Sequence, residues 1–152
     1  MKKSWVKKLG WSLLILLALL QLIRPSKNLA KAYGPNDYTS VLNVPQDVRA
    51  ILERSCFDCH SNFTHHKWYE NIQPIGWWIA NHIHEGKEEL NFSEFSTYSA
   101  KRRAHKLEEI AEEVSDGEMP LSSYLWMHHD AKLSEAEKTA LVRWVKNIKQ
   151  ED

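Results

Sequence analysis

The stretch Cys56-Phe57-Asp58-Cys59-His60 decides how the rest of this sequence is interpreted. Two cysteines separated by two residues can each form a thioether bond to a vinyl group of haem, and the histidine that follows can offer its imidazole to the iron. Cys56 and Cys59 are the only cysteines in the chain, so none is left for a structural disulfide. The motif therefore predicts one covalently bound haem c, with His60 as its proximal iron ligand.

Three other interpretations of the motif remain open at this point. A redox-active dithiol would use Cys56 and Cys59 themselves, but the βαβ pattern that usually surrounds such a dithiol is missing. A zinc site could combine the cysteines with two histidines from His60, His65 and His66, although structural zinc sites usually draw on separated ligand pairs. The third interpretation is that the spacing arose by chance.

The N-terminal residues combine a basic cluster with an apolar run. Four lysines lie among the first eight residues, and the run 9–23 carries no charge. Basic residues before an apolar segment favour a cytoplasmic N-terminus, with the body of the chain across the membrane. We therefore expect residues 1–24 to form a membrane-anchoring helix of a single-pass protein, with its haem domain on the periplasmic side of the cytoplasmic membrane. Secretion after signal cleavage near Ala32 is the alternative, because an A-x-A sequence ends there.

The remaining chain predicts a linker and one helical domain. Residues 25–44 contain several Pro, Gly, Asn and Ser residues without a sustained period, which is typical of a linker. We expect residues 45–150 to form an all-α, cytochrome c-like domain around the haem, because no stretch alternates long enough to predict a strand. A helix should lead from Pro45 into the haem motif, and the final helix should pack across it.

Local signals predict the other helices of this domain. Pro74 is well placed to start a second helix, with Gly86 as its stop. A third helix is expected over residues 99–115, with Gly117 just beyond its end. Ser134-Glu135-Ala136-Glu137 matches the capping box of a final helix.

Met119 is the candidate for the distal iron ligand. It lies in Gly117-Glu118-Met119-Pro120, where a methionine after a helix can point its thioether at a metal. About sixty residues separate it from His60, which is enough chain to return on the opposite face of a haem. The alternatives are a methionine that fills a gap in the core, and ligation by another histidine. The candidate histidines are His82, His84, His128 and His129.

Two further groups of residues allow two interpretations each. Trp77 and Trp78 could pack against the haem or fill an ordinary core. The basic half of the third helix could dock an acidic partner, although a charged run is usually a solvated face. This half contains Lys101, Arg102, Arg103 and Lys106. Formal net charge is zero and the basic residues are dispersed, so nothing indicates nucleic-acid binding.

With both motifs in hand, the chain resembles bacterial c-type cytochromes that carry one haem. It is more closely similar to a membrane-anchored haem-binding domain family, through the pattern C-x-D-C-H-S-N at residues 56–62 and over about residues 38–150. Further similar stretches are Trp68-Tyr69, Trp77-Trp78, His82 to Gly86, Asn91-Phe92-Ser93, Gly117 to Leu121 and Leu133-Ser134. The cytochrome resemblance implies a helical fold with His60 as proximal and Met119 as distal ligand. It names no redox partner.

These observations predict an electron carrier and not an enzyme. One haem c with His60 and Met119 as axial ligands would cycle between ferric and ferrous iron, and would exchange electrons with an unidentified partner protein. The alternative is a haem-based sensor or peroxidase-like protein with an open or weakly held sixth iron position. His82 or His128 would then act as a distal acid or base.

Overall fold

The computed structural model describes residues 2–151, with side chains described for residues 4–148. Within these residues the regular structure is helical, apart from one isolated β-bridge between Leu29 and Phe63, so the predicted all-α class is confirmed. The α-helices are α1 (Lys2–Leu20), α2 (Gln46–Ser55), α3 (Phe57–His60), α4 (Ile75–Glu89), α5 (Ala100–Asp116), α6 (Ser122–Leu125) and α7 (Glu135–Glu151). Four short 3₁₀ helices are η1 (Tyr38–Ser40), η2 (Trp68–Asn71), η3 (Phe92–Thr97) and η4 (His129–Ala131).

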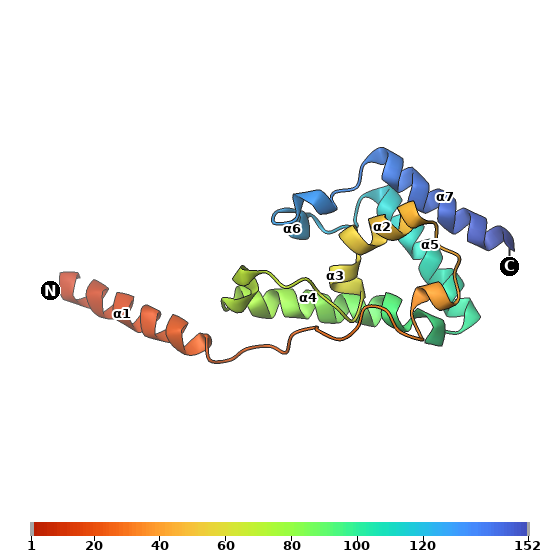
Figure 1. Cartoon of the computed structure of the whole chain (residues 1–152). Coiled ribbons are helices and arrows are strands. Elements are labelled where there is room, and N and C mark those ends of the chain that lie inside the picture. Colours follow the sequence, from red (N-terminus) through yellow and green to blue (C-terminus); the bar gives the residue numbers. More distant parts are fainter. Residues whose placement is uncertain (1, 152) are drawn as a thin grey trace.

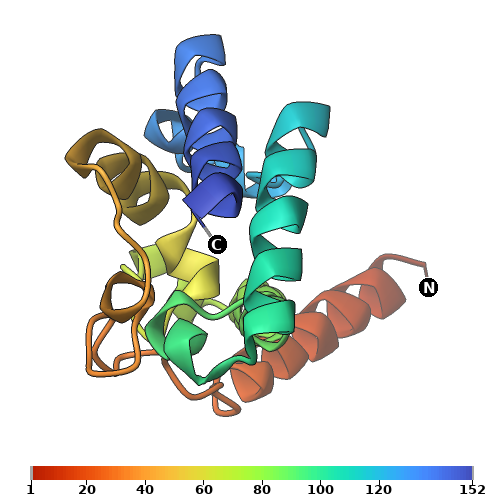
Figure 2. The same cartoon turned by 90° about the vertical axis from the view of Figure 1, so that its right-hand side faces the viewer.

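Helix α7 contacts both α2 and α5, as predicted for the first and last helices of the domain, and Figures 1 and 2 show the three together. Arg54 of α2 pairs with Glu137 of α7 at 2.7 Å. The apolar stripes of these helices meet in one core with an aromatic cluster from η1, α3 and η3. That cluster contains Tyr38, Phe57, Phe92 and Phe95, all of them buried.

The helix ends largely follow the signals in the sequence. Ser99 caps α5 by accepting a hydrogen bond from Arg102 N–H, and Gly117 ends the helix at φ 78°, where a side chain would be strained. The predicted stop at Gly86 is wrong, because α4 continues to Glu89. Gly86 is instead a place of close approach, since a Cβ there would lie 3.0 Å from the carbonyl oxygen of Cys59.

Helix α1 does not support the predicted membrane anchor. It projects away from the other helices in Figure 1, and its apolar side chains are exposed. Within residues 2–151, no helix has both the length and the apolar character needed to cross a bilayer. The helix ends at Leu20, so its uncharged part after Lys8 is about 18 Å long at 1.5 Å per residue, against roughly 30 Å of hydrocarbon. The predicted single-pass, membrane-anchored placement is therefore wrong.

The segment after α1 lies along the domain, and it comprises the end of the predicted anchor and the first part of the predicted linker. The side chain of Gln21 makes two hydrogen bonds with the backbone of Gln73, and the indole of Trp77 donates to the carbonyl of Ile23 at 2.8 Å. Further on, the carbonyl of Ala32 accepts a hydrogen bond from Ser93 in η3. Residues 21–33 therefore cover part of the surface formed by the residues that follow the haem motif.

Candidate functional site

Helix α3 presents the haem motif as a single tight turn. Helix α2 ends at Ser55, Cys56 leaves the helical region at φ −123°, and His60 N–H then donates to the carbonyl of Cys56 at 3.0 Å. Phe57 points into the aromatic core, where its ring stacks on Phe92 at a centroid distance of 5.2 Å. The Phe57 contact fixes α3 on the side of the aromatic core. The two cysteines and His60 line a pocket next to it.

The imidazole of His60 is oriented by two backbone carbonyls. Its Nδ1 lies 2.8 Å from Gly86 O and 3.1 Å from Leu90 O. Because both partners can only accept, Nδ1 carries the proton and Nε2 keeps its lone pair. Burial lowers the pKa of His60 below its ordinary value, which also favours the neutral ring. A neutral histidine whose second nitrogen is already bonded is the form in which histidine ligates a metal.

The two cysteines are half-buried free thiols that do not bond to each other. Burial is the main cause that raises the pKa of Cys56 and of Cys59 to about 12, and the nearby carboxylate of Asp58 contributes to the rise at Cys59. A redox-active dithiol needs a thiol pKa lowered toward neutrality, so this environment opposes the dithiol interpretation. Within residues 2–151, no group of three His, Cys, Asp or Glu residues could hold a metal ion, so the zinc interpretation has no ligand set.

Three neighbouring pockets lie around the motif and share lining residues, and we refer to them as three parts of one crevice. The Met119 part, about 280 Å³, is lined by Cys56, His60 and Met119 together with the apolar side chains of Phe92, Ile110, Val114 and Leu133. The central part, about 220 Å³, contains both cysteines, His60, His82 and Met119. The Trp78 part, about 320 Å³, is lined by Cys59, Trp78, His82, Tyr124 and Trp126. The volume of each part is close to or above the lower limit for small-molecule sites. Together the three parts offer room for a large flat ligand.

The predicted distal ligands are not equally placed around this crevice. Met119 lines two parts of it together with His60, and its N–H donates to Glu113 O at the end of α5. His82 shares the central part with His60, and its buried Nδ1 has no hydrogen-bond partner in the part of the chain that the structure describes. His128 reaches only the Trp78 part, where its ring nitrogens contact Tyr69 OH and Tyr124 O.

His84 and His129 lie on the exposed surface, and neither lines the crevice. His84 pairs with Glu88 at 3.3 Å. The structure therefore brings Met119 and His82 to His60, and leaves the other predicted alternatives farther away.

The two tryptophans of α4 face different surroundings. Trp78 lines the crevice and lies against the ring of His82, with 4.6 Å between ring centroids. Trp77 does not line the crevice, because its indole is bonded to the N-terminal segment at Ile23. Adjacent residues of a helix point about 100° apart, which is consistent with Trp77 and Trp78 facing different surroundings.

Tyr124 and Lys106 have contacts at the site that the sequence analysis did not predict, although it expected the aromatic residues of 121–129 near the cofactor. Tyr124 OH donates to Asp58 at 2.8 Å, between the two cysteines. Burial alone would raise the pKa of Asp58, but hydrogen bonds from His65 N–H and Tyr124 OH outweigh it and place that pKa below its usual value. Lys106, assigned above to a basic surface, is 8% exposed and lines the Met119 part of the crevice. It pairs there with Glu89 at 3.1 Å and with Glu109 at 2.6 Å.

Comparison with known protein families agrees with this geometry. A family model described as haem-binding domain matches residues 15–147. The chain belongs to the haem-binding domain family. No curated protein and no solved structure matches it. For this haem-binding domain, the half-buried cysteine pair, the imidazole with a free Nε2 and the mostly apolar crevice suit a covalently attached haem.

Proposed function

We propose that this haem-binding domain carries electrons through one haem c. Thioether bonds from Cys56 and Cys59 would attach the haem, and His60 and Met119 would be its axial ligands. The observation that supports this most directly is the pair of hydrogen bonds at His60 Nδ1, which leaves Nε2 available beside both cysteines and Met119. When bound, haem supplies an iron that accepts and returns a single electron.

The residues of the chain would set how readily that exchange occurs. Hydrogen bonds from Nδ1–H to Gly86 O and Leu90 O fix the plane of the His60 imidazole and strengthen Nε2 as a donor. A thioether ligand from Met119 favours the reduced state. The apolar side chains of the Met119 part would limit the access of water to the haem, while the ion pairs of Lys106 place charge in the same part. These roles are those of a carrier that exchanges electrons with a partner protein, and they include no substrate chemistry.

Replacing Met119 tests this proposal. In the matured, haem-loaded protein, Met119→Ala should change the ferric absorption spectrum and lower the midpoint potential, because a thioether ligand is lost. Met127→Ala is the matched control, since Met127 is 58% exposed and lines only the Trp78 part. An unchanged spectrum and potential in Met119→Ala would remove Met119 from the iron. A pyridine haemochrome assay on the same material tests covalent attachment by Cys56 and Cys59.

The position of His82 favours a second candidate function, that of a haem-based sensor or peroxidase-like protein. Its buried Nδ1 has no partner among the described residues and belongs to the crevice part that contains His60. There it could act as a distal acid or base at an open sixth position. Carbon monoxide should bind readily to the reduced protein if this candidate is correct. Resistance to carbon monoxide at neutral pH would support the six-coordinate carrier.

A further inference from the structure

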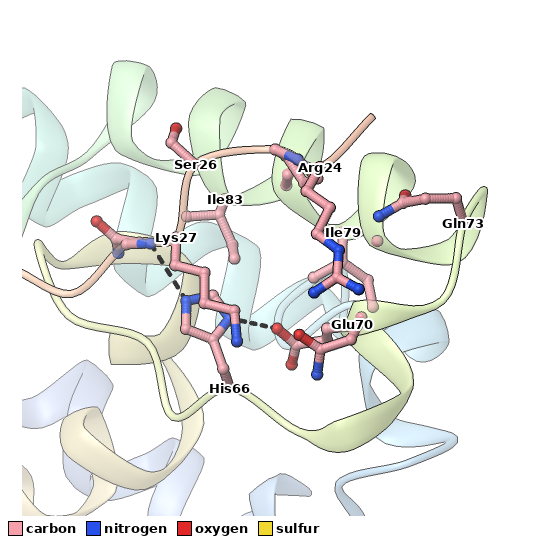
Figure 3. A pocket seen from close by; sticks show the side chains of 13 residues that line it. Arg24, Ser26, Lys27, His66, Glu70, Gln73, Ile79 and Ile83 are labelled. Atoms are coloured by element: carbon pink, nitrogen blue, oxygen red, sulfur yellow. Dashed lines mark hydrogen bonds and ion pairs between the residues drawn. The ribbon is translucent and has the colours of Figure 1, made fainter. Parts of the chain in front are cut away.

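A separate cavity lies between the N-terminal segment and α4 (Figure 3). Its volume is about 150 Å³, and neither cysteine, His60 nor Met119 lines it. The N-terminal segment contributes Arg24 and Lys27, while the chain around η2 and the start of α4 contributes His66, Glu70 and Gln73. This cavity is too small for haem, and the proposed electron transfer gives it no role.

Gln73 brings an unsatisfied hydrogen-bond donor to this cavity. The residue is only 2% exposed, and its Nε2 has no hydrogen-bond partner among the described residues. The amide cannot simply be reversed, because Oε1 accepts a hydrogen bond from Trp77 N–H at 3.0 Å. Gly76 provides the room for this amide, since a Cβ there would lie 2.9 Å from Nε2 and 2.3 Å from the carbonyl oxygen of Glu70. A fixed, buried donor without an acceptor is unfavourable unless a ligand supplies one.

The charges around the cavity favour a negative ligand. The side chains of Arg24 and Lys27 extend into it (Figure 3), and Lys27 has no ion-pair partner among the described residues. The only acidic side chain that lines it, Glu70, is already engaged, because its oxygens contact His66 Nδ1 and Lys67 N–H. His66 Nε2 accepts from Asn28 N–H, so the imidazole is neutral and adds no charge. Two cations therefore face one carboxylate, which leaves a net positive cavity.

We propose that this cavity is a binding site for a small oxyanion, with Gln73 Nε2, Arg24 and Lys27 as its donors. A phosphate or carboxylate group offers several acceptor oxygens within a few atoms, which suits both the donor set and the volume. The donors come from two distant parts of the chain. A bound oxyanion therefore holds the N-terminal segment against the start of α4, and stabilises the folded protein by mass action.

The test is a titration of the haem-loaded protein with inorganic phosphate, at constant ionic strength maintained with chloride. Calorimetry gives the dissociation constant, and thermal unfolding gives the linked stabilisation. Gln73→Glu keeps the acceptor for Trp77 N–H but removes the unpaired donor and adds a negative charge, so phosphate binding should weaken about tenfold or more. The haem spectrum should not change. Lys31→Gln is the matched control, because Lys31 is exposed on the same segment but does not line the cavity.

A second variant keeps the test valid if Gln73→Glu does not fold. Arg24 and Lys27 are exposed, so the double variant Arg24→Gln, Lys27→Gln should fold and should also lose phosphate binding. Acetate, titrated in the same way, distinguishes a site for carboxylate groups from one for phosphate. The proposal is overturned if neither anion binds saturably in the millimolar range, or if both variants bind as tightly as the wild type.

Discussion

Gly86 links the backbone of α4 directly to the proposed haem ligand. Its carbonyl accepts the hydrogen bond from His60 Nδ1, and a Cβ at this position would lie 3.0 Å from Cys59 O and 3.3 Å from Cys59 Cβ. Both contacts are tighter than side chains normally make, so a larger residue must displace α4 from α3. Because α4 also orients the imidazole, one methyl group can disturb packing and ligation together.

Gly86→Ala should therefore lower the free energy of unfolding by about 1–3 kcal/mol, in spite of the better helix propensity of alanine. It should also alter the haem spectrum through the moved imidazole. Urea unfolding and absorption spectroscopy of the matured protein measure the two effects. Gly10→Ala in α1 is the control, since no atom lies within 4 Å of a Cβ placed there. Equal stability of the two variants would contradict the role assigned to Gly86.

At the residue level, the candidate site residues could be identified from the sequence, but the groups that hold them in place could not. The spacing of Cys56, Cys59 and His60 carries its own chemical meaning, and the structure places all three at one crevice. The partners of His60 Nδ1 are carbonyls, which any residue can supply, so no sequence pattern could reveal them. Tyr124 and Lys106 reach the site only through the folding of distant helices.

At the level of elements, capping signals were more informative than residue type inside a helix. Pro74, Ser99 and Gly117 stand at the helix ends where they were expected, and the capping box at Ser134 is present. Gly86 was misassigned because the same residue can end a helix or permit a close contact. Helices of three to six residues, such as η2, η3 and α6, were not predicted because a single turn shows no periodicity.

The cap of α7 should make stability depend on pH. Glu137 accepts hydrogen bonds from Ser134 N–H and Oγ, and from Arg54, and these bonds lower its pKa to about 2. A carboxyl group whose pKa is lowered by folding stabilises the folded state above its unfolded pKa of roughly 4.3. That contribution is lost as the pH falls from there towards 2.

Glu137→Gln should reduce the free energy of unfolding by about 1 kcal/mol at pH 7, and the difference from wild type should disappear near pH 2. Denaturant unfolding at a series of pH values measures this. Glu135→Gln serves as the control, because Glu135 is 89% exposed and pairs only with Lys138. A difference that stayed constant with pH would show that charge at the cap is unimportant.

For the whole molecule, the sequence could not show how the segment before the domain contacts it. Its irregular composition predicted a linker, since composition reports only local preference. In the structure it joins parts of the domain that are far apart in sequence. Asn28 makes the most side-chain hydrogen bonds from this segment to the domain. Its side chain donates to Ser61 O and Thr64 Oγ1, at 2.8 and 3.0 Å, and accepts from Lys87 Nζ at 2.9 Å. Contacts across 33 to 59 residues leave no periodic signal in a sequence.

Asn28→Ala should therefore destabilise the whole domain, because Asn28 ties the turn after the haem motif to α4. Three hydrogen bonds at about 1 kcal/mol each predict a loss of about 2–3 kcal/mol in the free energy of unfolding. Hydrogen exchange should show faster exchange at Thr64 N–H, which donates to Asn28 O. Asn36→Ala, which removes one exposed 3.4 Å contact with Glu94, should cost little. If the two variants were equally stable, residues 21–33 would be a passive covering, because the domain would hold the haem motif without them.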